Sequence, residues 1–207
     1  MSAPTGNAEL EDLAVGSGGL SSGRDRDLPE TAPPRDTANW ISVSMQHLSS
    51  VGYMPPARIR NVTLWLPKDR KLTMHIVEVY FKQLNFHRPV LIKRDFEHVL
   101  NMLYEKQPVT YDPGFVCSLY LVLALGTMSE LNKIAGSTTE DLSRSPDLKK
   151  KLLDPAWPEN EELFERALAV KPDLRVTVSS LQALILLHWY LYCEVSLPYR
   201  LLICFFS

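Results

Sequence analysis

The apolar residues of this sequence predict a series of helices that begins near Lys68. Leu72, Ile76, Val79 and Tyr80 recur at the three- and four-residue spacing of an amphipathic helix. Phe86–Pro89 ends this helix, because proline disfavours helical geometry in the residue before it. We expect Asp95 to cap a second helix. The apolar face of that helix consists of Phe96, Val99, Leu100, Leu103 and Tyr104.

A third helix is predicted to begin at Pro113, where a missing N–H group costs little. The run from Phe115 to Met128 is apolar nearly all round, which is typical of a buried central helix. This run is shorter than the roughly 20 residues that a bilayer requires. The polar, proline-containing residues 136–157 then predict a loop.

Two further helices complete the predicted series. Pro158 opens the fourth, which is acidic in its first turn, as the helix dipole favours, and which Lys171-Pro172 ends. Its predicted buried face is Leu163, Phe164, Ala167 and Leu168. The fifth runs from Thr177 to Cys193. Leu181, Leu184, Ile185, His188 and Leu191 line up on one of its faces.

Before residue 63, large apolar residues are sparse, and glycine and proline are frequent. Such a segment buries too little surface to offset the entropy of ordering it. Residues 1–62 are therefore predicted to be a disordered linker, with a short helical turn over Trp40–Leu48. Asn61–Leu66 looks extended, and Pro67 opens the folded part. Since no strand segment of consequence is expected, the predicted fold class is all-α.

Composition limits the partners and the compartment. The sequence holds 22 Lys and Arg against 24 Asp and Glu, a net charge of −2, which gives no attraction to a phosphate backbone. Cys117, Cys193 and Cys204 are odd in number and widely spaced, so we expect no disulfide framework and a reducing compartment. The N-terminus lacks the apolar stretch of a secretory signal.

The sequence carries no pattern of catalytic, metal-binding or nucleic-acid-binding residues. His75, His87, His98 and His188 are not spaced as zinc ligands, and His188 is interpreted as a core histidine. No nucleophile turn, phosphate-binding glycine loop or Cys-x-x-Cys pair is present. We therefore expect no enzyme, and we assign no catalytic, cofactor-binding, metal or DNA-binding residue and no cofactor to this chain.

Four stretches follow one another between Leu66 and Glu194. They are Leu66–Asp69 with the helix ending in Tyr80-Phe81, the Phe86–Leu91 break before Phe96, the apolar helix Cys117–Met128, and the pair Glu161–Ala167 and Ser179–Leu187. In this order and spacing they resemble the middle, regulatory homology region of fungal zinc-cluster transcription factors. The last pair is the most specific part of this resemblance, because an aromatic-x-x-Ala helix is followed by a Ser-Leu-Gln-Ala-Leu helix.

The resemblance implies a nuclear protein that regulates transcription by RNA polymerase II and has protein partners or self-associates. Residues 63–194 would be the N-terminal part of the regulatory domain, so the chain would be a truncated fragment. The family binds zinc and DNA through a six-cysteine module, and no cysteine precedes Cys117 here. Two alternatives stay open. One is a tail-anchored membrane protein using residues 181–206, although Glu194 and Arg200 would be costly there. The other is a generic helical interaction scaffold.

Residues 195–207 depart from the resemblance, since the family continues into more helices. Val195-Ser196 is what an in-frame GT-AGT intron start encodes. We interpret residues 195–207 as an aberrant hydrophobic tail, from intron read-through or an error in gene prediction; a genuine short tail is the alternative. Either way, a partial helical domain leaves apolar faces without partners, and we expect self-association or poor solubility.

Overall fold

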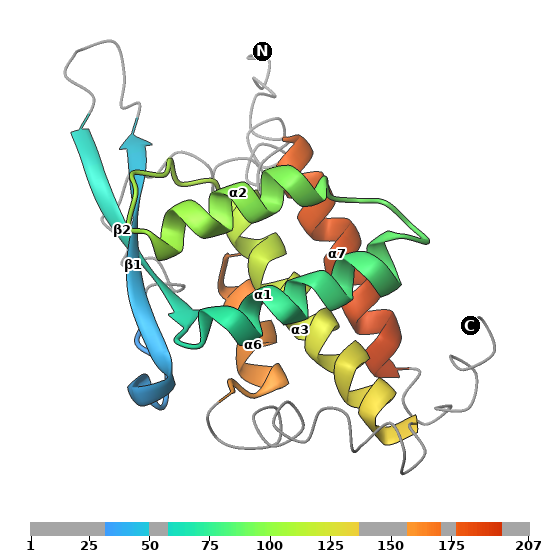
Figure 1. The fold of residues 1–207 in the computed structure, drawn as a ribbon. Helices are drawn as coiled ribbons and strands as arrows, with labels where there is room; N and C mark the ends of the chain where they lie inside the picture. The colour runs from blue at the N-terminus through green and yellow to red at the C-terminus, as the bar shows by residue number, and fades with distance from the viewer. Residues whose placement is uncertain (1–31, 50–57, 137–156, 171–176, 196–207) are drawn as a thin grey trace, which may run out of the picture.

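The computed structural model describes residues 32–49, 58–136, 157–170 and 177–195. These ranges hold mostly helix, together with one antiparallel pair of strands (Figure 1). The strands are β1 (Trp40–Ser49) and β2 (Arg58–Pro67). The α-helices are α1 (Arg70–Tyr80), α2 (Lys93–Tyr104), α3 (Pro113–Gly136), α6 (Asn160–Val170) and α7 (Val178–Val195). The predicted series of helices is confirmed, whereas the predicted all-α class is incomplete because it leaves out the pair of strands.

The strand pair corrects the prediction for the segment before residue 63. The expected helical turn over Trp40–Leu48 is wrong, because this segment forms β1, and the disordered linker is wrong for residues 32–49, which include a 3-10 turn at Thr37–Asn39, and for residues 58–62. In β1, Val43 and Met45 are buried, whereas the serines and glutamine between and beside them face outward. The extended reading of Asn61–Leu66 is confirmed. The rest of the linker prediction, at residues 1–31 and 50–57, lies outside the described residues.

The β-hairpin is attached to the helices by both strands. On the β1 side, Gln46 donates its N–H to the Val109 carbonyl at 2.7 Å and accepts from the Tyr111 N–H at 2.7 Å. On the β2 side, the Tyr120 hydroxyl donates to the Trp65 carbonyl at 2.9 Å, and the Tyr104 hydroxyl donates to the Pro67 carbonyl at 2.8 Å. A two-stranded hairpin is marginal by itself, so these contacts and the buried strand face hold it in place.

Helix α1 forms as its apolar spacing predicts. The Asp69 side chain caps it by accepting from the Leu72 N–H at 2.9 Å, and all four predicted apolar positions are buried. The chain then passes through a π-helical turn, Phe81–Asn85, and leaves helical structure at the predicted break. Asn85 shapes the following loop, because its side-chain oxygen accepts from the N–H groups of Val90 and Leu91 at 2.9 and 3.0 Å.

The predicted cap of α2 is wrong. The helix begins at Lys93, so Asp95 lies inside its first turn, and the N-cap position falls to Ile92, whose side chain makes no capping bond. Asp95 still suits its place, since a negative charge in the first turn is favoured by the helix dipole. The predicted apolar face is confirmed for Phe96, Leu100 and Leu103, which are buried.

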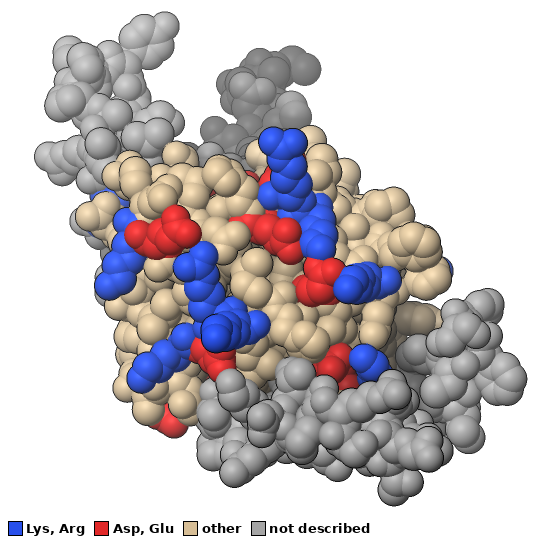
Figure 2. All heavy atoms as spheres, viewed as in Figure 1, with Lys and Arg blue, Asp and Glu red and all other residues tan. Residues whose placement is uncertain are grey.

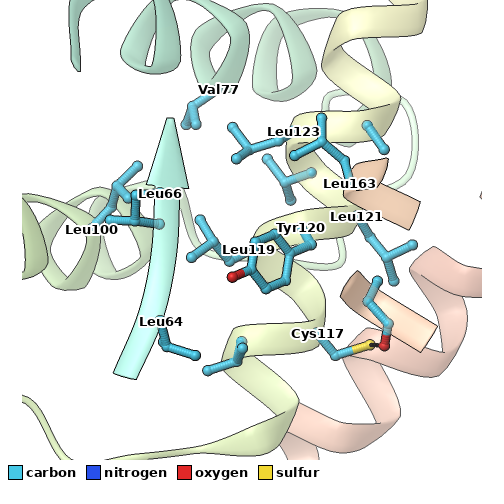
Figure 3. Close-up of a cluster of buried hydrophobic side chains, with 14 of the residues drawn as sticks. Leu64, Leu66, Val77, Leu100, Cys117, Leu119, Tyr120, Leu121, Leu123 and Leu163 are labelled. Atoms are coloured by element: carbon cyan, nitrogen blue, oxygen red, sulfur yellow. Dashed lines mark hydrogen bonds between the residues drawn. The ribbon is translucent and has the colours of Figure 1, made fainter. Parts of the chain in front are cut away.

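Helix α3 is the centre of the fold, as its apolar run predicts. Every residue from Val116 to Leu125 is buried, and α1, α6 and α7 pack around it (Figure 1). Figure 3 shows Leu119, Tyr120, Leu121 and Leu123 among side chains from the strand and from the surrounding helices. In this cluster the Cys117 thiol donates to the Ala167 carbonyl of α6 at 3.4 Å.

Part of the predicted buried face of α6 is confirmed. Leu163 and Ala167 are buried, and the half-buried Phe164 stacks on Tyr190 of α7 with ring centroids 4.2 Å apart. The prediction that Leu168 is buried is wrong, because its side chain is exposed. Arg166 is buried in its place. The predicted loop lies outside the described residues from 137 to 156, as does the tail from 196 to 207.

Candidate interaction surface on α7

The predicted apolar face of α7 is not the one that packs in the core. The buried residues are Ser180, Ala183, Leu186, Leu187 and Tyr190. The positions that the sequence lined up are exposed instead, and the core-histidine interpretation of His188 is wrong. The reason is that α7 is apolar on almost every side, so the spacing of its apolar residues did not identify the inner face.

The exposed residues of α7 lie along one side of the helix and are apolar except for His188, and we call this side the α7 outer face. It consists of Val178, Leu181, Leu184, Ile185, His188, Leu191 and Tyr192. The six apolar side chains in this set retain between 38% and 75% of their accessible surface. Single exposed apolar residues are ordinary, but a contiguous patch of this kind is typical of a binding surface.

The α7 outer face also lacks charge. No Asp, Glu, Lys or Arg occurs from Val178 to Cys193. The surface of α1 and α2 is the opposite, since Lys and Arg alternate with Asp and Glu there (Figure 2). Glu78 pairs there with both Lys82 and Lys93, and hydrogen bonding from Lys93 is the largest of the effects that lower the pKa of the Glu78 carboxyl. A face of mixed sign does not favour a nucleic acid.

Contacts at the N-terminus and along one side hold α7 in place. At its N-terminus, the Thr177 hydroxyl accepts from the Ser180 N–H at 3.1 Å, and the Ser179 hydroxyl donates to Asp112 at 3.0 Å. Along one side, Gln182 donates to the Val90 carbonyl at 2.7 Å, and the Arg88 guanidinium lies 5.7 Å from the Trp189 ring centroid. The outer face is therefore presented on a fixed helix.

The histidines weighed as metal ligands are not brought together. His75 lies 3.4 Å from the buried carboxylate of Glu130, whereas His87, His98 and His188 are exposed. Within the described residues, no three His, Cys, Asp or Glu side chains form a group that could hold a metal ion. The His75–Glu130 pair thus remains a contact between α1 and α3.

Arg166 is a structural residue that the sequence analysis did not identify. Its guanidinium lies 4.6 Å from the Trp40 ring centroid, donates to the Ala32 carbonyl at 3.2 Å and pairs with Glu162 at 3.2 Å. It therefore fastens the segment before β1 to α6. The carboxylate of Glu162 at i−4 was visible in the sequence, but the contact with Trp40, which is distant along the chain, was not.

One helix in the described ranges is long and apolar enough to cross a membrane, from Pro113 to Ile134. Its length of 22 residues exceeds that of the apolar run singled out from the sequence. However, 78% of its apolar window is buried inside the protein, which is how the core helix of a globular domain lies. Residues 181–195 of the alternative tail anchor belong to α7, whose inner face packs in the same core.

Comparison with family models, with curated proteins and with solved structures found no match to this chain.

Proposed function

We propose that this chain is a helical regulatory module of a nuclear transcription factor, of the fungal zinc-cluster kind, that acts through protein contacts. The observation that carries the protein-contact part is the α7 outer face, a fixed, uncharged and exposed apolar surface. The transcriptional part depends on the resemblance of the ordered stretches between Leu66 and Glu194. DNA binding and zinc would come from a module that this sequence does not contain.

The packing supports treating those stretches as parts of one unit. In the structure, the helix ending in Tyr80 is α1, the apolar helix is α3, and the final helix pair is α6 and α7. All four helices contribute side chains to one hydrophobic core. The break at residues 86–91 contacts α7 through Gln182 and Trp189. The stretches of the resemblance are therefore neighbours in space as well as in order.

The proposal is tested by tethering the whole chain to an unrelated DNA-binding domain upstream of a reporter gene. We expect reporter expression to differ from that of the DNA-binding domain alone. The variant Leu181→Glu/Ile185→Glu should abolish the difference, because it places two charges on the α7 outer face. Phe86→Glu is the matched control, since Phe86 is apolar and 76% exposed but lies outside that face. An unchanged reporter with the parent chain would contradict the proposal.

Location is tested separately with a fluorescent fusion and cell fractionation. The proposal expects nuclear fluorescence and release of the chain from the membrane fraction by alkaline carbonate. Retention in the carbonate-washed membranes would instead favour the tail anchor at residues 181–206. Because α3 and the inner face of α7 are buried in the folded domain, we expect release.

A further inference from the structure

We propose that the α7 outer face is a homotypic interface, at which α7 packs against α7 of a second copy of this chain. The inference rests on the proposed role of this face in protein contact and not on the role in transcription. It follows from the spacing of the exposed residues, from the absence of charge beside them, from the area that they offer, and from the rigidity of the helix.

The exposed residues have the spacing of a coiled-coil seam. Val178, Leu181, Ile185, His188 and Tyr192 follow one another at intervals of three, four, three and four residues. Apolar residues at these intervals lie along one stripe of a helix and pack into the side chains of a facing helix. Leu184 and Leu191 are also exposed and flank this stripe on one side. The pattern therefore fits a helix as the occupant of the face.

The chemistry of the stripe favours an identical helix. In coiled coils, charged residues beside the seam select the partner through attraction and repulsion. Helix α7 itself has no Asp, Glu, Lys or Arg in or beside the seam, and Arg88, from the loop before α2, lies over the ring of Trp189 at its edge. Two copies can therefore approach without burying an unpaired charge, which would be costly, and without like-charge repulsion. A strongly charged partner helix would gain no complementary ion pair here.

The exposed area is sufficient for a modest dimer. The exposed parts of the six apolar side chains amount to on the order of 600 Å² in each copy, so two copies bury at most about 1,200 Å², at the lower end of stable interfaces. Gln182 and the capping contacts of Thr177 already fix α7 in the single chain. Little backbone entropy is therefore lost on association, which favours binding through a small area.

The proposal is tested by sedimentation equilibrium of the full chain across a range of concentrations. We expect a monomer–dimer equilibrium, and we expect Leu181→Glu/Ile185→Glu to raise the dimer Kd at least about 100-fold, because two charges per copy would be buried. Tyr192→Glu is a second variant on the same face, at a side chain that is 67% exposed and whose replacement leaves the core intact. Phe86→Glu should leave the Kd unchanged. Circular dichroism should show the same helix content in all four proteins.

Three outcomes would overturn the proposal. The first is association that the two α7 variants leave unchanged or that Phe86→Glu removes, since the contact would then lie elsewhere. The second is a chain that stays monomeric at about 100 µM, far above the Kd range of specific complexes. The third is a monomer that dimerises only after Leu202→Glu/Phe205→Glu, which would mean that the chain's own C-terminal residues occupy the face. None of these results depends on the reporter measurement, so this inference and the proposed function fail separately.

Discussion

Two arginine–glutamate pairs lie where the segment before β1 meets helix α6, one within α6 and one between the two segments, and they differ in burial. Arg166 and Glu162 have side chains only 9% and 14% exposed, and the guanidinium also contacts Trp40. Arg35 and Glu165 form a pair of the same length, 3.2 Å, in which both side chains are largely exposed. An exposed pair contributes little because water screens it, whereas a buried charge that loses its partner is strongly destabilising.

Arg166→Met is therefore expected to lower the free energy of unfolding by roughly 2–3 kcal/mol, since it removes the Trp40 contact and leaves Glu162 buried without its partner. The matched variant Arg35→Met should lower it by less than about 1 kcal/mol. Urea denaturation of both variants measures the difference. Equal losses of unfolding free energy in the two variants would show that the buried pair does not hold the segment before β1 against α6.

Buried tyrosines predict a loss of stability at alkaline pH. Burial raises the pKa of Tyr104 to about 12 from an ordinary 10.0, and burial also raises the pKa of Tyr80. In the unfolded chain these hydroxyls lose their protons first, so unfolding becomes more favourable as the pH rises. The stabilisation is complete below pH 10 and is lost as the pH rises toward 12. Urea denaturation at pH 9 and pH 11.5 should show this decline, and Tyr104→Phe should reduce it.

At the scale of elements, the fold depends on how closely the helices approach α3. Gly126 of α3 lies against α1, where a Cβ atom would come 2.5 Å from the Ile76 carbonyl oxygen. Gly114 has the same role near α7, where a Cβ atom would lie 2.4 Å from the Ser179 backbone. Backbone atoms cannot yield as a flexible side chain does, so both glycines set interhelical distances.

Gly126→Ala is expected to destabilise the fold by about 2 kcal/mol, although alanine is the better helix former by about 1 kcal/mol, because the added methyl group forces α1 away from α3. Asn132→Ala, at an exposed position of the same helix, is the control and should be neutral or slightly stabilising. Thermal unfolding followed by circular dichroism compares the two. A more stable Gly126→Ala variant would contradict the close approach.

The whole molecule has two sides of different character. The side formed by α1 and α2 carries charged residues of both signs (Figure 2), whereas α7 has no Asp, Glu, Lys or Arg from Val178 to Cys193. The hairpin lies at one edge of the helical body and α7 near the opposite edge (Figure 1). The hairpin and a partner bound to α7 therefore occupy separate parts of the surface.

If two copies pair through α7, folding and association are linked, and the melting temperature depends on protein concentration. We expect the melting temperature of the parent chain to rise by about 2 °C for each tenfold increase in concentration. The Leu181→Glu/Ile185→Glu variant should melt at one temperature throughout, because its α7 outer face no longer pairs. Differential scanning fluorimetry across a hundredfold concentration range makes the comparison. A concentration-independent melt of the parent chain would count against pairing.

The sequence alone determined those elements in which polar residues occupy one side of the helix and apolar residues the other. Four of the six buried positions of α1 and all three buried positions of α2 followed from this contrast, since a helix of this kind has one way to remove its apolar residues from water. The central place of α3 followed from its apolar run, because a helix without a polar side is stable only when surrounded. Proline marked the start of α3 and the break after α1, because its effect depends on neighbouring residues only, whereas the Asp69 cap of α1 was found only in the structure.

Tertiary structure decided the rest. The alternation of Val43 and Met45 with polar residues forms a strand only because residues 58–67 pair with it and the helices cover one face, and these contacts join residues distant in sequence. Likewise, Arg166 connects α6 to β1 only because the tertiary fold places Trp40 beside it. For α7, both sides are apolar, so the local pattern fits two orientations equally well. Packing against α3 buries Leu186 and Tyr190 and leaves Leu181 and Tyr192 exposed, and this choice creates the candidate interaction surface.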